Sequence, residues 1–372
     1  MHLGRNSSAR IALTVALTLA ATSAAHADIT TSFSGFGTVG GSFTSDSNYG
    51  YAHDASEYTK ATNQFDIGLE SRLGLQGRVD FGSGFSVTAQ EVFRERGNNE
   101  FDPGTEWLYV QYSPDSDLQI RAGRVVLPVF LYSDSRQVGY AAPWFRSPNE
   151  VYGEFPFNYV DGGQITWQKS LGRFSFTVQG TTGSTSGTFQ SGTLTIVTNA
   201  RDIFNESVSV TYGDFLVRIA QTTLSSPNSL PLTPTFTLNY VEHGTYLSAG
   251  AQYDNGRAVI LGEWVNSKQN PAPIFNEPLT ASKSWYASAG WRFNKLLPLV
   301  TYGSVHEEQS ILSTPYTKNS WSGSLRYDVV SNIALKAEVT RALGSDGLYY
   351  ATTNTASDKH VNVYSIGADF VF

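Results

Sequence analysis

Arginines and carboxylates are the side chains of this chain that could act on another molecule, and they fall into two groups. The first group consists of arginines at alternating positions within repeats of apolar and polar residues: Arg72, Arg94, Arg96 and Arg121. The second group lies between residues 132 and 157 and mixes both signs of charge: Asp134, Arg136, Arg146, Glu150 and Glu154. Charges of opposite sign that face each other across confined water act strongly on a dissolved solute. The two groups therefore predict a charge filter for small polar molecules.

Sequence signals of enzymes, metal sites and cofactor sites are weak or absent. The chain has no Cys, which excludes disulfides, thiolate ligands and cysteine nucleophiles. Four histidines follow residue 27 without metal-binding spacing: His53, His243, His306 and His360. Neither Gly-x-Ser-x-Gly nor His-Glu-x-x-His occurs, and the Gly-x-Gly-x-x-Gly pattern from Gly35 to Gly40 lies in a predicted strand without the helix that a dinucleotide site requires. We therefore predict no enzyme, no metal site and no cofactor.

The composition favours strands over helices. The 372 residues include 34 Gly, 22 Phe and 20 Tyr but a single Met. Gly weakens helices, and aromatic residues prefer strands. Charged residues make up 15% of the chain and the net charge is −7, which argues against disorder and against binding to the phosphates of nucleic acid.

The first 27 residues have the features of a secretory signal peptide. Arg5 and Arg10 precede an apolar run from residue 11 to 21, and Ala25-His26-Ala27 matches a cleavage site of small residues. The run is shorter than the about 20 residues of a membrane-spanning helix, which disfavours the alternative of a membrane anchor. We predict a signal peptide at 1–27 and an exported mature chain at 28–372.

The mature chain repeatedly alternates apolar and polar residues, most regularly from Phe65 to Phe81. Successive side chains of a strand point to opposite faces, so such a segment has one apolar and one polar face. In a soluble sandwich the apolar face would pack on a second sheet. In a transmembrane barrel it contacts lipid, and the polar face lines a water-filled lumen.

The lengths of the connections favour the barrel. We predict sixteen strands, at 29–43, 64–81, 85–96, 105–112, 118–131, 158–168, 173–182, 203–212, 215–223, 244–253, 257–267, 283–293, 297–309, 318–328, 332–344 and 361–372. Long connections alternate with tight turns, as in barrels whose short turns face the periplasm. The segment Thr235–His243 could be a further strand but is assigned to an external loop, and eighteen strands is the alternative. The fold class is therefore all-β, an antiparallel barrel that must close on itself and is wide enough for an aqueous channel.

Several motifs resemble those of the trimeric porins of Gram-negative bacteria. Arg72-Leu73-Gly74-Leu75-Gln76-Gly77 is similar to the Arg-Leu-Gly-x-x-Gly of their second strand, and Gly123-Arg124 is similar to the end of their fifth strand. The last strand ends in Phe372, with Tyr364 and Phe370 on the same face. The third long connection, 132–157, is the longest, but it reads Ser147-Pro148-Asn149-Glu150 where the family has Pro-Glu-Phe-Gly-Gly.

The resemblance implies an outer-membrane location, a homotrimer, and a third loop that folds inward to narrow the barrel. It also implies that Arg72 and Arg124 line the pore, although alternation alone would place Arg124 outward unless a bulge occurs near Gly123. The terminal residues Tyr364, Phe370 and Phe372 would be the signal that the barrel assembly machinery recognises. Outer-membrane lipid and lipopolysaccharide are the remaining expected partners, and no nucleic acid is expected.

The predicted filter leaves two alternatives open for each kind of residue in the third loop. Its carboxylates could face the arginine wall and create a transverse field, or they could pin the loop to that wall. Its aromatic residues, among them Tyr140, Trp144 and Tyr152, could pack on the wall or line a path for a solute. The expected function is passive diffusion of small hydrophilic solutes and ions, filtered by size and charge. The alternatives are a porin selective for sugars or organic anions, a non-conducting structural barrel, and an outer-membrane enzyme.

Overall fold

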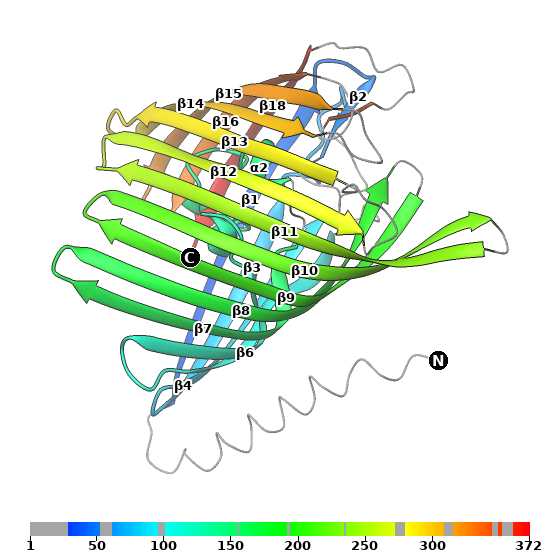
Figure 1. Cartoon of the computed structure of the whole chain (residues 1–372). Helices are drawn as coiled ribbons and strands as arrows, with labels where there is room; N and C mark the ends of the chain where they lie inside the picture. Colours follow the sequence, from blue (N-terminus) through cyan, green and yellow to red (C-terminus); the bar gives the residue numbers. More distant parts are fainter. Residues whose placement is uncertain are drawn as a thin grey trace.

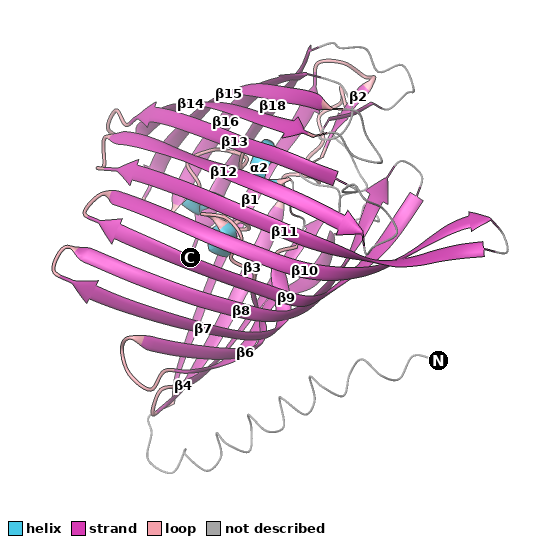
Figure 2. Cartoon of the chain, in the orientation of Figure 1, coloured by secondary structure: helices cyan, strands magenta, loops and turns pink. Residues whose placement is uncertain are grey.

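The computed structural model describes residues 29–52, 62–95, 101–153, 155, 157–191, 194–233, 236–271, 280–308, 315–343, 349–351 and 360–372. The predicted signal peptide lies outside these residues, as do Arg96 and Glu154. None of the described helices is long and apolar enough to cross a membrane. Strand dominates the described chain, and the few short helices lie within the ring of strands (Figure 2).

Sixteen antiparallel strands form one closed barrel, which confirms the predicted fold class and strand count (Figure 1). Each strand pairs with its neighbours in sequence, and the barrel closes where the last strand, β18, pairs with the first, β1. The strands are β1 (Thr30–Thr44), β3 (Arg72–Gly82), β4 (Phe85–Glu95), β5 (Phe101–Tyr112), β6 (Leu118–Val126), β7 (Tyr159–Leu171), β8 (Phe174–Ser191), β9 (Leu194–Tyr212), β10 (Phe215–Thr233), β11 (Phe236–Asp254), β12 (Ala258–Pro271), β13 (Thr280–Trp291), β14 (Leu296–Glu307), β15 (Tyr316–Val330), β16 (Ile333–Leu343) and β18 (His360–Val371).

The side chains of the strands alternate between the inside and the outside of the barrel. On β13, Ser284, Tyr286 and Ser288 are buried, whereas Trp285 and Ala287 between them are exposed. The exposed set is apolar and the buried set carries the hydroxyl groups. This distribution is the reverse of a soluble sandwich, and it fits a cylinder with a polar interior and an apolar outer surface.

The segment predicted as a loop at Thr235–His243 is strand from Phe236 on, and the sequence prediction was wrong there. Phe236 begins β11, and its ladder with β10 runs from Thr233↔Phe236 to Phe215↔Tyr253. The segment prolongs one hairpin instead of adding a strand, so the count stays at sixteen. In Figure 1 this hairpin extends well beyond its neighbours.

Two other strands are shorter than predicted. The second barrel strand begins at Arg72, because the Asp66 carboxylate accepts hydrogen bonds from the backbone N–H groups of Gly68 and Leu69, at 2.9 and 3.1 Å. These bonds turn the chain out of the ladder. The strand predicted at 118–131 ends at Val126, shortly before Pro128, which has no N–H to donate to a ladder.

Two short strands outside the barrel, β2 (Tyr49–Tyr51) and β17 (Tyr349–Ala351), pair with each other. They belong to the first and last long connections. Buried residues around them form a small apolar cluster: Tyr49, Tyr51, Leu69, Ala342, Val361 and Val363. This cluster packs the first connection against the C-terminal end of β16 and the N-terminal end of β18.

Candidate functional site

Residues 127–158 connect β6 to β7, and we call them the inner loop. Its described residues, 127–153, 155, 157 and 158, fold into the barrel. They contain three short helical turns, η1 (Ser133–Ser135), η2 (Gly139–Ala141) and α2 (Asn149–Tyr152). The turn η2 contacts β1 and β18, and α2 contacts β12, β13 and β14. In the strand order β1 and β18 lie four and five strands from β6, and β12, β13 and β14 lie five to seven strands from β7 in the other direction. The inner loop therefore crosses the lumen, and it includes the loop predicted at 132–157.

The aromatic residues of the inner loop pack on the wall that the loop reaches. Trp144 is 1% exposed, and its Nε1 donates hydrogen bonds to Ser288 (2.9 Å) and Thr301 (3.1 Å). Its ring meets that of Tyr286 edge-on, with 5.5 Å between the ring centroids. Tyr152 is also fully buried, whereas the Tyr140 hydroxyl donates to the Ser331 carbonyl at the turn after β15 (2.7 Å). These contacts match the packing alternative.

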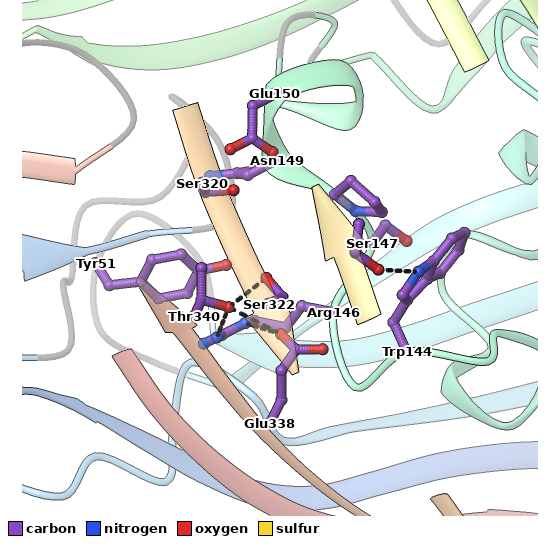
Figure 3. Close-up of a pocket in the computed structure, with 12 residues that line it drawn as sticks. Tyr51, Trp144, Arg146, Ser147, Asn149, Glu150, Ser320, Ser322, Glu338 and Thr340 are labelled. Atoms are coloured by element: carbon purple, nitrogen blue, oxygen red, sulfur yellow. Dashed lines mark hydrogen bonds and ion pairs between the residues drawn. The ribbon is translucent and has the colours of Figure 1, made fainter. Parts of the chain in front are cut away.

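Arg146 is the centre of a buried ionic cluster between the inner loop and the wall (Figure 3). Its guanidinium lies 3.2 Å from Glu338 and 3.4 Å from Glu70, and it donates a hydrogen bond of 2.6 Å to Ser365. The Tyr51 ring covers it at 4.4 Å from the ring centroid. The pinning charges are therefore reversed from the expected arrangement, because a loop arginine binds wall carboxylates.

Basic residues of the wall also hold the backbone of the inner loop. The Lys336 ammonium donates to the carbonyls of Gly139 (2.7 Å), Ala142 (2.8 Å) and Trp144 (2.8 Å). Arg326 donates to the carbonyls of Tyr140 (2.7 Å) and Ala142 (3.0 Å). In a regular strand these carbonyls would accept hydrogen bonds from the backbone N–H groups of a neighbouring strand. Here they accept them from the cationic groups of Lys336 and Arg326.

A third anchor is the carboxylate of Glu263 on β12, which is 4% exposed. It accepts hydrogen bonds from the Leu131 backbone N–H (2.6 Å), the Tyr152 hydroxyl (2.5 Å) and the Tyr286 hydroxyl (2.9 Å). Sequence reasoning missed Glu263, Lys336 and Glu338 as functional residues. Their inward positions in predicted strands were available, but the sequence does not show which part of the wall the loop reaches.

Four arginines line one cavity on the other side of the inner loop. Arg72 on β3 and Arg94 on β4 are directly opposite each other in the ladder. Arg136 and Arg146 reach the same cavity from the inner loop, and Arg136 donates to the carbonyls of Tyr152 (2.8 Å) and Phe155 (2.9 Å). No residue that lines this cavity, among those the structure describes, carries a carboxylate. We call it the arginine passage.

The remaining arginines of the predicted basic wall lie elsewhere. Arg121 points inward, but it is bound by Gln111 (2.9 Å) and Gln164 (3.2 Å) and does not line the arginine passage. Arg124 does not line the pore. It is in register with Leu108, which is 45% exposed on the outer face, and it pairs with Asp161 at 2.7 Å. No bulge interrupts the ladder at Gly123, so the alternation places Arg124 outside.

The carboxylates of the inner loop do not face the arginine passage in the expected way. Glu150 is 3% exposed and lines a different cavity, with Ser320 beside it (Figure 3). Asp134 is exposed in η1 and does not line the arginine passage. Neither of the two described loop acids therefore faces the wall arginines across the arginine passage, as the expected transverse field would require.

The buried position of Glu150 predicts a pH-dependent effect on stability. Burial raises the pKa of the Glu150 carboxyl, and the nearby Glu338 carboxylate raises it further. The folded chain therefore favours the neutral acid, and the stability from this group is full below pH 4.5 and is lost as the pH rises through the raised pKa. Glu150→Gln should raise the Tm relative to the wild type at about pH 8 but not at about pH 4.

The matched control is Glu308→Gln, because the Lys283 hydrogen bond lowers the pKa of Glu308. That variant should give no gain at the higher pH. Melting curves of the two variants and the wild type, followed by circular dichroism in detergent, measure both effects. An equal Tm difference for Glu150→Gln at both pH values would contradict the assignment of a buried, neutral acid.

The C-terminal aromatic residues lie on the outer face of β18 and cover glycines of β1. A Cβ on Gly37 would lie 2.4 Å from the Phe370 ring, and one on Gly35 would lie 2.3 Å from the Phe372 ring. Tyr364 stacks on Phe43 with 5.0 Å between the ring centroids. The three predicted C-terminal signal residues therefore line the seam at which the barrel closes.

Comparisons with known proteins agree with this architecture. OmpT of Vibrio cholerae, in a trimer form, is 14% identical, with a TM-score of 0.62 over 92% of this chain and 99% of that chain. An anion-selective porin from Comamonas acidovorans is 13% identical, with a TM-score of 0.60 over 93% of this chain and 100% of that one. The channel DcaP of Acinetobacter baumannii is 10% identical, with a TM-score of 0.57 over 92% and 97%.

No curated protein sequence matches the chain. The family model described as "Gram-negative porin" matches residues 12–370, which is nearly the whole chain. The match, the closed barrel and the inward loop point to the same protein class. The chain belongs to the Gram-negative porin family, whose members are outer-membrane channels.

Proposed function

We propose that this porin is a passive channel whose arginine passage favours small anionic solutes. The observation that carries the proposal is the arginine passage, which Arg72, Arg94 and Arg136 line together with Arg146, whose guanidinium is also ion-paired with Glu70 and Glu338. The loop acid Glu150 is buried and lines a different cavity. A confined passage in which cationic side chains outnumber carboxylates attracts anions and repels cations. A structural neighbour is itself described as an anion-selective porin.

The test is the reversal potential of the channel in a potassium chloride gradient across a planar bilayer. We expect the wild type to prefer chloride and the Arg72→Gln/Arg94→Gln double variant to lose most of that preference. A charge at about 4 Å in water is worth about 1 kcal/mol, which corresponds to about a fivefold change in ion partition for each arginine. Arg121→Gln is the matched control, because Arg121 faces inward outside the arginine passage. An unchanged reversal potential in the double variant would refute the proposal.

Selective passage of organic dianions is a second candidate function. Arg72 and Arg94 are directly opposite in the ladder, and like charges in such positions repel each other. A ligand with two carboxylates would neutralise both and could use the bidentate geometry that guanidinium groups offer. Succinate should then reduce the chloride current at concentrations at which acetate and glucose do not. Equal effects of succinate and acetate on the chloride current would refute selectivity for dianions and leave only the general preference for anions.

We also propose the partners that the family resemblance implies: a homotrimer, outer-membrane lipid and lipopolysaccharide, and the barrel assembly machinery. One structural neighbour, OmpT of Vibrio cholerae, is described in a trimer form. The seam position of Phe370 and Phe372 supports a role in assembly, because these rings complete the outer surface when β18 joins β1.

A further inference from the structure

The ladder between β1 and β18, which we call the seam, joins the two ends of the sheet without a connecting turn. In a hairpin the turn fixes which residues lie opposite each other, as between β15 and β16, which are joined by residues 331 and 332 alone. The register of the seam also sets the shear of the closed barrel, and with it the tilt of the strands and the width of the lumen. A feature other than a turn must therefore specify this register.

The inner loop covers three consecutive inward pairs of the seam: Thr38↔Asp369, Gly40↔Gly367 and Ser42↔Ser365. Gly139 of the loop lies against the first pair, since a Cβ there would be 2.7 Å from the Thr38 hydroxyl oxygen. Arg146 of the loop donates hydrogen bonds to both members of the third pair, Ser365 (2.6 Å) and Ser42 (3.4 Å). The two serine hydroxyls are also bonded to each other at 2.7 Å. The inner loop therefore contacts both strands of the seam.

The buried ring of Phe145 lies over the middle pair and leaves no room for a side chain there. A Cβ on Gly40 would lie 2.9 Å from this ring, and one on Gly367 would lie 2.8 Å from it. The strand β16 holds the loop backbone at this point. The Phe145 N–H donates a hydrogen bond to the Glu338 carboxylate (3.2 Å), and the Lys336 ammonium donates to the carbonyl of the preceding residue (2.8 Å). The ring is therefore fixed relative to β16 and faces β1.

The outer face of the seam tolerates a slip of two residues. Phe370 lies opposite Gly37, and after such a slip of β1 it would face Gly35. Tyr364 would face Gly41 in the same slipped register, so both rings would again meet glycines. A slip of one residue is excluded separately, because it turns the polar side chains of the strand toward lipid. The outer rings therefore do not choose between registers that differ by two residues.

The inner face does choose between these registers. The slip that leaves the outer rings on glycines brings Thr38 opposite Gly367, where Gly40 lies in the native register. A slip of two residues in the opposite direction brings Ser42 to the same place. In either case a side chain would overlap the Phe145 ring, and overpacking of a dense interior is destabilising.

We propose that the inner loop sets the register in which the barrel closes. The Phe145 ring, held by β16, accepts β1 only where Gly40 lies opposite Gly367, and Arg146 then binds the paired hydroxyls of Ser42 and Ser365. The loop that crosses the lumen thus also specifies the shear of the cylinder around it. This role in folding is independent of the proposed preference for anions.

Cross-linking across the seam measures the register directly. The chain has no Cys, so cysteine pairs can be introduced on the outer face. Val39→Cys/Ala368→Cys reports the native register, and Val39→Cys/Ile366→Cys reports the slip of two residues. Directly opposite residues have Cβ atoms about 5 Å apart, and residues two positions away are about 7–8 Å apart. Dibromobimane, a short reagent that becomes fluorescent only after both of its arms have reacted with thiols, distinguishes the two spacings in the refolded full-length barrel.

The decisive variant is the exchange Thr38→Gly/Gly40→Thr, which moves the inward glycine of β1 by two positions without changing the composition. With Phe145 in place, β1 should slip so that the new glycine lies under the ring. The ratio of slipped to native cross-linking should then rise at least about tenfold over that of the unexchanged β1. Adding Phe145→Ala should abolish this rise, because no ring then opposes the native register.

The matched control for Phe145→Ala is Phe155→Ala in the same loop. Phe155 is also buried, but its ring packs on Tyr246 of β11, with 4.8 Å between the ring centroids. Phe155→Ala should leave the slip of the exchange variant unchanged. Abolition of the slip by both substitutions would mean that general loosening of the loop is responsible, and it would refute the role of the ring.

Two further outcomes overturn the proposal. One is an exchange variant that cross-links only in the native register. The other is a slip that persists after Phe145→Ala, because the Ile366 carbonyl oxygen, which is also 2.9 Å from a Cβ at position 40, would then set the register. If the exchange variant gives no compact band in unheated gel electrophoresis, the added Phe145→Ala decides instead. Restoration of the band supports a clash with the ring, and failure to restore it refutes the proposal.

Discussion

Replacing Lys336 by Met is expected to loosen the inner loop and to lower the stability of the barrel. Lys336 donates to three loop carbonyls and forms an ion pair with Asp369 at 2.9 Å, and both side chains are at most 2% exposed. Removal of the ammonium leaves the Asp369 carboxylate buried without its counter-charge. Breaking one side of a buried ion pair costs about 3–5 kcal/mol. The loop should then move more freely within the lumen.

Two measurements check the effect of Lys336→Met. The Tm should fall in a circular dichroism melt, and single-channel recordings should show a larger or noisier conductance because the loop no longer holds one position. Lys295→Met is the control, since Lys295 is exposed in the turn between β13 and β14, and its ammonium donates to the Val329 carbonyl at the end of β15 and to no inner-loop carbonyl that the structure describes. A variant with wild-type Tm and a quiet, unchanged conductance would show that the loop does not depend on Lys336.

Replacing Gly123 by Ala is expected to disrupt folding where the chain leaves the wall. Gly123 has a φ of 128°, a conformation that residues with a side chain rarely adopt. A Cβ there would lie 2.3 Å from the Leu108 carbonyl oxygen and 3.0 Å from the Tyr109 Cα, and both are backbone atoms that cannot rotate away. Backbone strain of this kind costs about 1–3 kcal/mol before the clash is counted. The β5–β6 ladder ends here, between Leu108 and Arg124.

The control for Gly123→Ala is Gly77→Ala on β3, where a Cβ would meet nothing within 4 Å. The first variant should give little folded protein, seen as loss of the compact band in unheated gel electrophoresis, and the second should fold like the wild type. Equal yields of folded protein from the two variants would mean that the strands can separate at Gly123 without loss.

The sequence predicted the barrel well because alternation is a local property. A strand between lipid and water must alternate wherever it crosses the membrane, so Arg72, Arg94 and Arg121 could be placed inside by position alone. The same rule placed Arg124 outside, and the family resemblance misled where it implied a pore-lining role. The segment from Phe236 alternates too, but a separate strand there would make the count odd, and the prediction therefore assigned it to a loop; the structure instead makes it the first part of β11.

The anchoring of the inner loop could not be predicted, since it depends on contacts between residues far apart in the sequence. Arg146 meets Glu70 and Glu338, which are 76 and 192 residues away. The inward faces of sixteen strands offer many polar side chains, and only the path of the loop selects among them. The sequence therefore predicted opposed charges across the lumen, whereas in the structure the loop residue Arg146 pairs with Glu70 and Glu338 and also lines one cavity with Arg72, Arg94 and Arg136.

The closure between β1 and β18 has a consequence for biogenesis. Thr38 on β1 donates a hydrogen bond to Asp369 on β18 at 2.6 Å, and the two residues are 331 positions apart in the sequence. The first strand to be exported therefore stays unpaired on this side until the last strand arrives. Until then β1 has one row of unpaired peptide groups, which oily surroundings do not tolerate. A chain truncated before β18 remains an open sheet, and its edge strands keep unpaired N–H and C=O groups that can pair with other chains. Closure of the barrel therefore requires the last strand, because β1 can pair its free edge only when β18 has been synthesised.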